Sequence, residues 1–278
     1  MTAPGPIAPT QTPTIASLYA EQFTPAGTAK GVVVISHGYA EHCGRYRELA
    51  NVIVAAGWLA ISYDVRGHGQ SPGERGYIER FGTYVDDLRA VIAHARTLVP
   101  DPTRLVLLGH SHGSLITLRA LCDERPPQCT AAIVSSPFLG LRLPVPAYKK
   151  LLAKVASRVA PKLTQPNALR VEDLTTDRQK QQERVADKLC FDIATARWFT
   201  EAAAAQAYVA AHANRIAVPT TWLVGGADPI ADPAQSRIVA AKVPKADYHD
   251  LAGLKHEVFN EASRADVFAL VTRALASA

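Results

Sequence analysis

The sequence predicts an α/β fold, with a mostly parallel central sheet, helices on both faces and an inserted helical cap. Three observations support this prediction. Short β-branched runs alternate with helix-like periodicity, polar motifs directly follow several expected strands, and the alternation stops between residues 137 and 213. Strands that alternate with helices form parallel sheets. Because such sheets bind ligands beyond the carboxyl ends of their strands, we expect the functional site at that rim.

Length and composition exclude several classes of protein. With 278 residues, 48% of them apolar, the chain can bury a substantial core. Its net charge of +5 comes without a basic run interleaved with aromatic residues, so we expect no nucleic-acid partner. No stretch reaches the roughly 18 apolar residues of a membrane span, and residues 1–14 lack a signal-peptide pattern. We therefore expect a cytoplasmic protein with reduced cysteines; the sequence does not indicate an oligomeric state.

The first part of the core is expected at residues 15–136, after a flexible proline-rich tail at residues 1–14. A loosely alternating stretch predicts an edge strand at residues 17–23. Further strands are predicted where short apolar runs occur, at residues 30–36, 58–63, 104–109 and 130–135. Apolar residues that recur every three or four positions predict helices at residues 45–56, 81–98 and 112–124.

The cap is expected at residues 137–213, where a helical pattern with several prolines replaces the strand–helix alternation. The alternation resumes in the second part of the core, residues 214–278. Strands are predicted there at residues 219–224 and 246–251, and helices near residues 233–242 and 262–276.

A candidate nucleophile lies between an expected strand and an expected helix, in the motif Gly109-His-Ser-His-Gly113. This is the setting of a nucleophile elbow, whose tight turn exposes the serine hydroxyl above the sheet. A second match to Gly-x-Ser-x-Gly occurs at residues 69–73, but Ser71 precedes Pro72. Proline has no N–H to donate to an oxyanion. The sequence therefore predicts Ser111 as the nucleophile.

A serine nucleophile needs an adjacent base, which a third group orients. The order along the chain in such folds is serine, acid, histidine, which excludes the histidines that precede Ser111. His110 and His112 are expected to point away from the position of the base. His212 precedes the candidate acids, so none of these three histidines is favoured as the base.

His256 is favoured as the base because it lies in the loop after the last expected strand, whereas His249 lies within that strand. Asp228 is favoured as the acid because it follows an expected strand at the rim. Asp232 suits the N-cap of the helix that begins at Pro233. The predicted triad is Ser111, Asp228 and His256.

An oxyanion hole needs two converging N–H donors. The backbone N–H of His112, directly after the nucleophile, is the first candidate. The second is the N–H of Tyr39, in the loop after the first central strand, where Gly38 lets the backbone turn toward a substrate.

Together these motifs resemble the monoacylglycerol lipase and lysophospholipase family of α/β-hydrolases, of the serine aminopeptidase S33 type. The resemblance runs from about Leu18 to the C-terminus and rests on residues 37–46, 63–73, 75–78, 81–87, 109–113, 194–198 and 255–261. It implies an α/β-hydrolase fold with a helical cap, the triad and the oxyanion donors named above, and no metal or cofactor. It also implies cleavage of carboxylic esters of glycerol or lysophospholipid type, with a small acyl ester as substrate.

This chain departs from the family pattern at four positions. His112 stands where methionine is usual, Ser114 where glycine is usual, Cys43 where a small residue is usual, and Lys188 where proline is frequent. His112 either adds a titratable group beside the oxyanion hole or packs at the helix start. Cys43 is either a reactive thiol or a buried small hydrophobe.

One helix of the cap is expected to be amphipathic. Tyr148, Leu151, Leu152, Val155 and Val159 fall on one face, and four basic residues lie outside it. This face either lines an acyl pocket, for which Tyr148, Leu151, Leu152 and Val155 are the candidate residues, or makes transient contact with a lipid surface. Alternatively it packs on the core and leaves a solvated basic face.

Two other functions remain open from the sequence. A peptidase or amidase of the same fold would need an acidic anchor for a substrate amine, for which Glu172, Asp173 and Glu183 are candidates. A non-catalytic ligand-binding protein would not need a complete triad.

Overall fold

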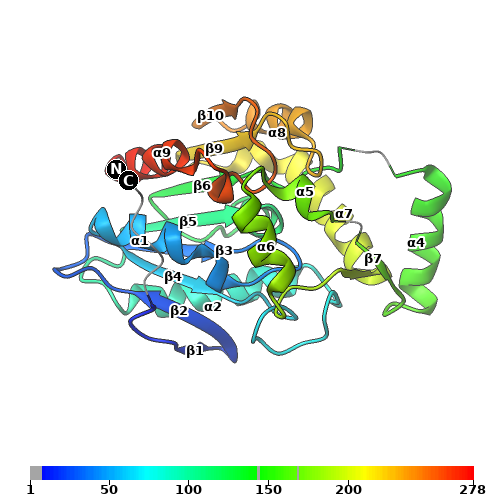
Figure 1. Ribbon diagram of the computed structural model, residues 1–278, viewed down its shortest axis with the longest axis horizontal. Coiled ribbons are helices and arrows are strands. Elements are labelled where there is room, and N and C mark those ends of the chain that lie inside the picture. The colour runs from blue at the N-terminus through cyan, green and yellow to red at the C-terminus, as the bar shows by residue number, and fades with distance from the viewer. Residues whose placement is uncertain (1–7, 143–144, 168) are drawn as a thin grey trace.

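The computed structural model describes residues 8–142, 145–167 and 169–278. Within these residues, the main sheet has eight strands in the order β1-β2-β4-β3-β5-β6-β9-β10 (Figure 1). They are β1 (Thr14–Ile15), β2 (Leu18–Phe23), β3 (Val32–Ser36), β4 (Leu59–Tyr63), β5 (Leu105–His110), β6 (Ala131–Ser135), β9 (Thr220–Gly225) and β10 (Ala246–Leu251). From β4 to β10 in this order, neighbouring strands pair in parallel. β2 pairs antiparallel with both of its neighbours, β1 and β4. The predicted fold class is confirmed.

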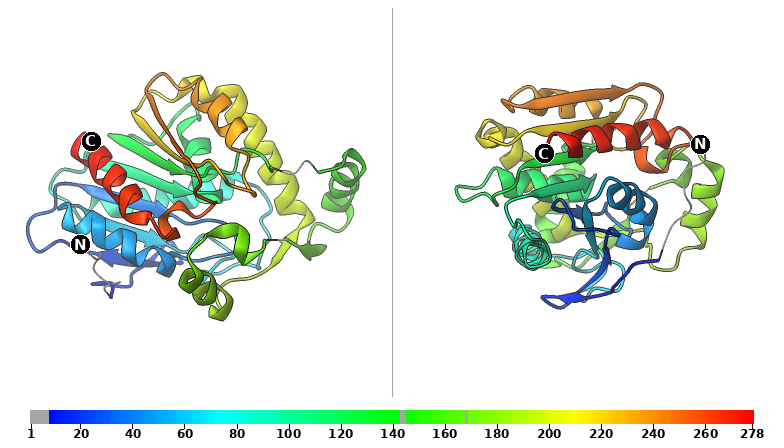
Figure 2. Two further views of the ribbon diagram at one scale, coloured as in Figure 1. Left: turned by 45° about the horizontal axis from the view of Figure 1, so that its top comes forward. Right: turned by 90° about the vertical axis from the view of Figure 1, so that its left-hand side faces the viewer.

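Helices cover both faces of the sheet and enclose two apolar cores. Val33 and Ile35 belong to the core under α1 (Arg47–Ala55) and α9 (Arg264–Ala276), which lie side by side in Figure 2. Val32 and Val34 belong to the opposite core, under α2 (Gly82–Arg96), α3 (His112–Leu121) and α8 (Pro233–Ala240). Alternate strand residues point to opposite faces. Burial on both faces therefore explains the continuous apolar run of β3.

Several helices are shorter than predicted. Helix α3 ends at Leu121, since prolines at positions 126 and 127 follow and cannot continue a helix. Helix α1 begins at Arg47, after a 3₁₀ turn, η1 (Cys43–Tyr46). Two further 3₁₀ turns are η2 (Ala213–Arg215) and η3 (Val258–Asn260).

The N-terminal edge of the sheet differs from the prediction. β2 was expected to be an edge strand, but β1 pairs outside it, with Ile15 opposite Leu18. Ala16 and Ser17 form the turn between them with positive φ angles of 48° and 71°. Such a turn normally carries asparagine and glycine, so this hairpin could not be predicted from the turn residues. Residues 8–14, expected in the flexible tail, include Thr10, whose backbone N–H donates to the Gln22 carbonyl at 2.8 Å.

In the described part of residues 137–213 there are four helices: α4 (Ala147–Val159), α5 (Val171–Leu174), α6 (Arg178–Ala186) and α7 (Ala196–His212). Helix α7 packs on α3, and α4 lies at the outer edge of the molecule against α7 (Figure 1). The stretch also contains two short strands that the sequence did not predict, β7 (Thr164–Pro166) and β8 (Ile193–Thr195), which form an antiparallel pair. These strands are too short for an alternating pattern to reveal them. No helix in the described ranges combines the length and the apolar character that crossing a membrane requires.

The start of α3 approaches the end of β3 very closely. A Cβ atom on Gly113 would lie 2.0 Å from the carbonyl oxygen of Ser36 and 2.6 Å from that of His37. Both neighbours are backbone atoms of the central sheet, so they cannot move aside. A glycine at position 113 is therefore required for the helix to begin where it does.

We predict that Gly113→Ala lowers the free energy of unfolding by at least about 2 kcal/mol, because overpacked side chains force backbone shifts. Gly82→Ala is the matched control. It also lies in the first turn of a helix, but its Cβ would meet nothing within 4 Å. Urea unfolding of both variants checks the difference, and equal stabilities would contradict the close approach.

Candidate active site

Ser111 occupies the turn between β5 and α3 in a strained backbone conformation. Its φ is 50° and its ψ is −111°, a region that non-glycine residues rarely adopt. The turn is so tight that a Cβ atom on Gly109 would lie 2.6 Å from the backbone of Gly113. The two glycines thus let the strand and the helix meet, as the elbow motif predicts.

The structure brings together the three residues of the predicted triad, which lie far apart in the sequence. The Ser111 hydroxyl lies 2.9 Å from Nε2 of His256, and Nδ1 of His256 lies 2.7 Å from Oδ2 of Asp228. Asp228 follows β9 and His256 lies in the loop between β10 and η3. All three residues are buried. This arrangement can transfer a proton from the serine to the imidazole.

The environment of His256 favours its protonated form. Burial acts to lower the pKa of His256, but the Asp228 carboxylate outweighs burial and raises the pKa above its ordinary value. Oδ1 of Asp228 in turn accepts hydrogen bonds from the backbone N–H groups of Ile230 and Ala231, at 2.8 and 3.0 Å. These bonds fix the carboxylate with its second oxygen facing the imidazole.

His110 was expected to point away from the base, and this expectation is wrong. Its ring lies 4.9 Å from the ring of His256, and its Nδ1 lies 3.1 Å from Oγ of Ser135. Burial, together with the nearby His256, lowers the pKa of His110 to about 4. His110 therefore stays neutral and packs against the base, because β5 ends beside the loop that carries His256.

The loop after β3 is held by its own side chains. Nε2 of His37 accepts from the Val65 N–H at 2.9 Å, so Nδ1 carries the proton and donates to the Gly38 carbonyl at 2.7 Å. The N–H of Gly38 donates to Oε1 of Glu41 at 2.6 Å. A Cβ atom on Gly38 would lie 2.7 Å from that same oxygen, so a larger residue here would displace the Glu41 carboxylate. The predicted oxyanion donor Tyr39 follows directly.

A buried charged network beside this loop was missed by the sequence reasoning. Arg45 contacts Glu257 through two hydrogen bonds of 3.0 and 2.7 Å and lies 3.0 Å from Glu41. Burial acts to raise the pKa of Glu41, but Arg45 and its other neighbours lower it to about 2. The Glu41 carboxylate is therefore ionised at neutral pH. The signal was present in the sequence, since Glu41 and Arg45 lie in the quoted motif at residues 37–46 and Glu257 adjoins His256.

The first residue of α3, His112, has two separate roles in the structure. Its backbone N–H belongs to the first turn of the helix, where no intrahelical partner exists. Its side chain is fully buried, and its Nε2 accepts from Nε1 of Trp198 at 3.4 Å. Burial, followed by His37, lowers the pKa of His112 to about 3. Of the two expected alternatives, the structure favours packing at the helix start.

The other three departures from the family pattern, Cys43, Ser114 and Lys188, take no part in the hydrogen bonds between Ser111, His256 and Asp228. Cys43 is fully buried and burial raises the pKa of its thiol, so it fits the expectation of a small hydrophobe. Ser114 donates to the Gly109 carbonyl at 2.7 Å and accepts from the Ser135 N–H at 3.1 Å. It therefore ties α3 to β5 and β6. Lys188 is exposed.

The alternatives that the sequence disfavoured have other partners. Ser71 donates to the Asp64 carbonyl at 2.6 Å and accepts from the Tyr19 N–H at 2.9 Å. Asp232 caps α8, as predicted, by accepting from the Ala234 N–H. His249 lies within β10 and pairs with Asp247 at 2.9 Å.

A cavity of about 800 Å³ opens at Ser111 and His256. Its walls include the polar side chains of Glu41, Arg45, Arg184 and Glu257, and apolar residues of α4 and α7. Of the four pocket residues predicted from the sequence, Tyr148 and Leu152 line the cavity, whereas Leu151 and Val155 do not belong to its lining. Only part of the expected apolar face of α4 contacts the cavity, because the helix turns one side of that face toward it. Lys149, expected outside, therefore lines it instead.

The acidic anchors considered for a peptidase lie elsewhere. Glu172, Asp173 and Glu183 are not among the residues that line the cavity. The carboxylates that do line it, those of Glu41 and Glu257, are both engaged by Arg45. The geometry therefore gives no specific support to recognition of a substrate amine.

Comparisons with known proteins agree with this fold. The model of the family described as serine aminopeptidase, S33, matches residues 27–263. The phospholipase YtpA of Bacillus subtilis is 32% identical over 244 residues, covering 85% of this chain and 92% of the relative. A monoacylglycerol lipase of Mycolicibacterium smegmatis is 32% identical over 247 residues, covering 86% of this chain and 85% of the relative. A crystal structure of the monoacylglycerol lipase of Paleococcus ferrophilus matches with a TM-score of 0.85 at 28% identity, covering 94% of this chain and 98% of that chain. The chain therefore belongs to the serine aminopeptidase S33 family of α/β-hydrolases.

Proposed function

We propose that this protein is a serine hydrolase that cleaves carboxylic esters of the monoacylglycerol or lysophospholipid type. The observation that carries the proposal is the hydrogen-bonded chain from Ser111 through His256 to Asp228, which opens into a largely apolar cavity. Relatives that bear the names phospholipase and monoacylglycerol lipase support ester cleavage as the reaction.

In the proposed first half-reaction, Oγ of Ser111 attacks the ester carbonyl carbon while Nε2 of His256 takes the hydroxyl proton. The backbone N–H groups of Tyr39 and His112 donate to the oxyanion that forms on the carbonyl oxygen. Asp228 holds the imidazole and stabilises its positive charge. The protonated His256 then donates to the leaving alkoxide oxygen, the ester C–O bond breaks, and the alcohol departs from an acyl-enzyme.

In the second half-reaction, water replaces the alcohol. His256 takes a proton from the water as the water attacks the acyl carbonyl, and returns it to Oγ of Ser111 as the acyl bond breaks. The fatty acid leaves and the free serine is restored. The same three side chains and the same two N–H donors serve both steps, so no further cofactor is required by this scheme.

The cavity lining supports an amphipathic substrate. Leu152, Ala156 and Phe199 contribute apolar surface that suits an acyl chain. Arg184, whose guanidinium donates a hydrogen bond to the Ala40 carbonyl, contributes further N–H donors that suit the oxygen-rich alcohol part of a glycerol ester. We propose that residues 137–213 act as a cap, because α4 and α7 of this stretch supply much of the apolar wall.

We predict that Ser111→Ala lowers kcat for p-nitrophenyl esters by about 10⁴-fold or more, since the nucleophile is lost. The variant should also lose covalent labelling by a fluorophosphonate probe. Ser71→Ala is the control, since it alters the second Gly-x-Ser-x-Gly match, and it should still be labelled. Wild-type turnover by Ser111→Ala would disprove the proposed role.

The pH dependence of kcat/KM should reflect the raised pKa of His256. Only neutral imidazole can accept the serine proton, so activity falls as pH decreases through that pKa, which lies above the ordinary value of 6.5. We predict that Asp228→Asn moves this acid limb to lower pH and reduces kcat by up to about 10⁴-fold. Asp232→Asn is the matched control, because asparagine caps helices as well as aspartate does. An acid limb that stays in place in Asp228→Asn would contradict the assignment.

We further propose that α4 docks on lipid surfaces while it delivers substrate to the cavity. Tyr148, Leu151, Leu152, Val155 and Val159 are between 51% and 77% exposed, so this apolar face is not covered by the core. Lys150, Lys154 and Arg158 of the same helix are suited to contact anionic headgroups. Because Tyr148 and Leu152 also line the cavity, the docked face would adjoin its wall.

The double substitution Leu151→Ser and Val155→Ser tests this docking, because neither residue lines the cavity. We predict that the affinity for anionic phospholipid vesicles, measured by sedimentation, falls by about tenfold or more, because two apolar side chains are lost from the surface that the lipid would bury. Turnover of a short, soluble ester should stay unchanged. Ile238→Ser on α8, which removes another exposed apolar residue, should leave vesicle binding intact. Equal sedimentation of the double variant and the wild type would refute the docking.

A further inference from the structure

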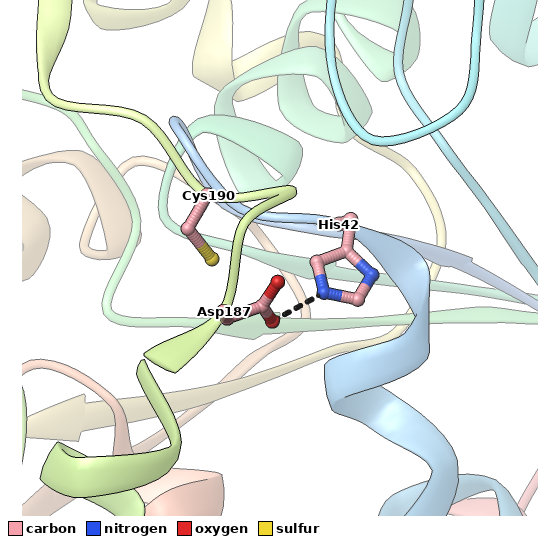
Figure 3. Close-up of side chains that lie close together, drawn as sticks. All are labelled: His42, Asp187 and Cys190. Atoms are coloured by element: carbon pink, nitrogen blue, oxygen red, sulfur yellow. Dashed lines mark hydrogen bonds and ion pairs between the residues drawn. The ribbon is translucent and has the colours of Figure 1, made fainter. Parts of the chain in front are cut away.

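A cluster of metal-ligating side chains lies outside the cavity, between the core and residues 137–213. Nε2 of His42 lies 2.6 Å from Oδ2 of Asp187. One ligating atom from each of His42, Asp187 and Cys190 lies within 4.8 Å of the others. Figure 3 shows the three side chains converging from two separate segments, the loop before η1 and the turn after α6. None of the three lines the cavity.

We propose that His42, Asp187 and Cys190 form a binding site for Zn²⁺. Imidazole nitrogen, carboxylate oxygen and thiolate sulfur are the three ligand types that zinc takes in proteins, at about 2.0 to 2.3 Å. A thiolate and a carboxylate also balance the two charges of the ion. A hard cation such as Mg²⁺ would not favour the sulfur ligand. With water as the fourth ligand, the set gives the tetrahedral coordination that zinc prefers.

The ligands are held in place by the local backbone. Oδ1 of Asp187 accepts from the Leu189 N–H at 2.9 Å, which leaves Oδ2 facing His42. The N–H of Cys190 donates to the Asp187 carbonyl at 3.3 Å, so both ligands belong to one turn. All three residues are half-buried, which leaves the site accessible to an ion from solvent. Small movements of the side chains would bring the three atoms to bonding distance.

Zinc binding requires a defined change of protonation. In the free protein, Nδ1 of His42 accepts from the Gly44 N–H at 3.2 Å, so the ring proton resides on Nε2 and faces Asp187. When zinc takes Nε2, that proton moves to Nδ1 and the long Gly44 contact is given up. The Cys190 thiol loses its proton to solvent as the S–Zn bond forms. Binding therefore releases one proton and tightens as pH rises.

The ion would join two segments that meet next to the proposed oxyanion donor Tyr39. The N–H of Phe191 donates to the Ala40 carbonyl at 3.2 Å, and the guanidinium of Arg184 donates to the same oxygen at 2.9 Å. Both donors flank the turn that carries Asp187 and Cys190. Through His42, zinc would therefore fasten this turn to the core two residues beyond Ala40.

Cobalt binding to the untagged protein tests the site without any substrate, so the result does not depend on the proposed hydrolysis. We expect Co²⁺ to give a near-ultraviolet thiolate-to-cobalt absorption band that is lost in Cys190→Ser. Cys129→Ser is the matched control, because Cys129 is also a half-buried free thiol but has no place in the cluster, and it should keep the band. Absence of the band from the wild type, or its persistence in Cys190→Ser, would overturn the proposal.

A competition titration with a zinc-binding dye gives the second measurement. Zinc should bind the wild type at least tenfold more tightly than Cys190→Ser or His42→Gln; the latter keeps an amide donor for Asp187 but removes the imidazole. Excess zinc should raise the Tm of the wild type and not of these variants, because an ion that binds only the folded state stabilises it. Equal affinities, or equal shifts of Tm, would show that His42 and Asp187 form only a hydrogen bond.

Discussion

The strained turn at Ser111 is the constraint on which the site depends. The serine adopts a positive φ because β5 must end and α3 must begin within one residue. The helix start lies so close to β3 that Gly113 would collide with the Ser36 carbonyl if it had a side chain. Such backbone conformations cost about 1–3 kcal/mol and persist only where the surroundings enforce them. Here the enforcement comes from β5, whose six residues are all buried between its neighbours β3 and β6.

Several buried histidines lie around this turn, and the neighbours of each one decide its pKa. His256 has a raised pKa, because the Asp228 carboxylate outweighs the burial that acts against it. His110 and His112 have pKa values lowered to about 4 and about 3, because burial dominates there. Burial also lowers the pKa of His37, whose ring bonds to the backbone of its own loop. The base is therefore set apart from the others by its direct contact with the Asp228 carboxylate, to which Glu257 and Glu41 add smaller effects in the same direction.

The stretch at residues 137–213 joins two different kinds of surface. Trp198 of α7 stacks on Tyr39, with ring centroids 3.8 Å apart, and donates to His112, so this end of α7 is packed against the elbow. Helix α4 instead keeps a long apolar face exposed at the edge of the molecule. A buried anchor and an exposed apolar face in the same stretch suit a segment that positions the site and also meets an amphipathic substrate.

The alternation of strands and helices and the elbow motif could be predicted without a structure, because they follow from local periodicity and from glycine spacing. Chain order and rim position also sufficed to select Asp228 and His256, which the structure places within hydrogen-bonding distance of each other. Contacts between other side chains depend on how distant segments pack, which local patterns do not encode. Arg45 joins Glu41 to Glu257 across more than two hundred residues, and His110 turns toward His256. The sequence likewise could not predict that the apolar face of α4 is exposed. A helical pattern shows that a face is apolar but not what covers it.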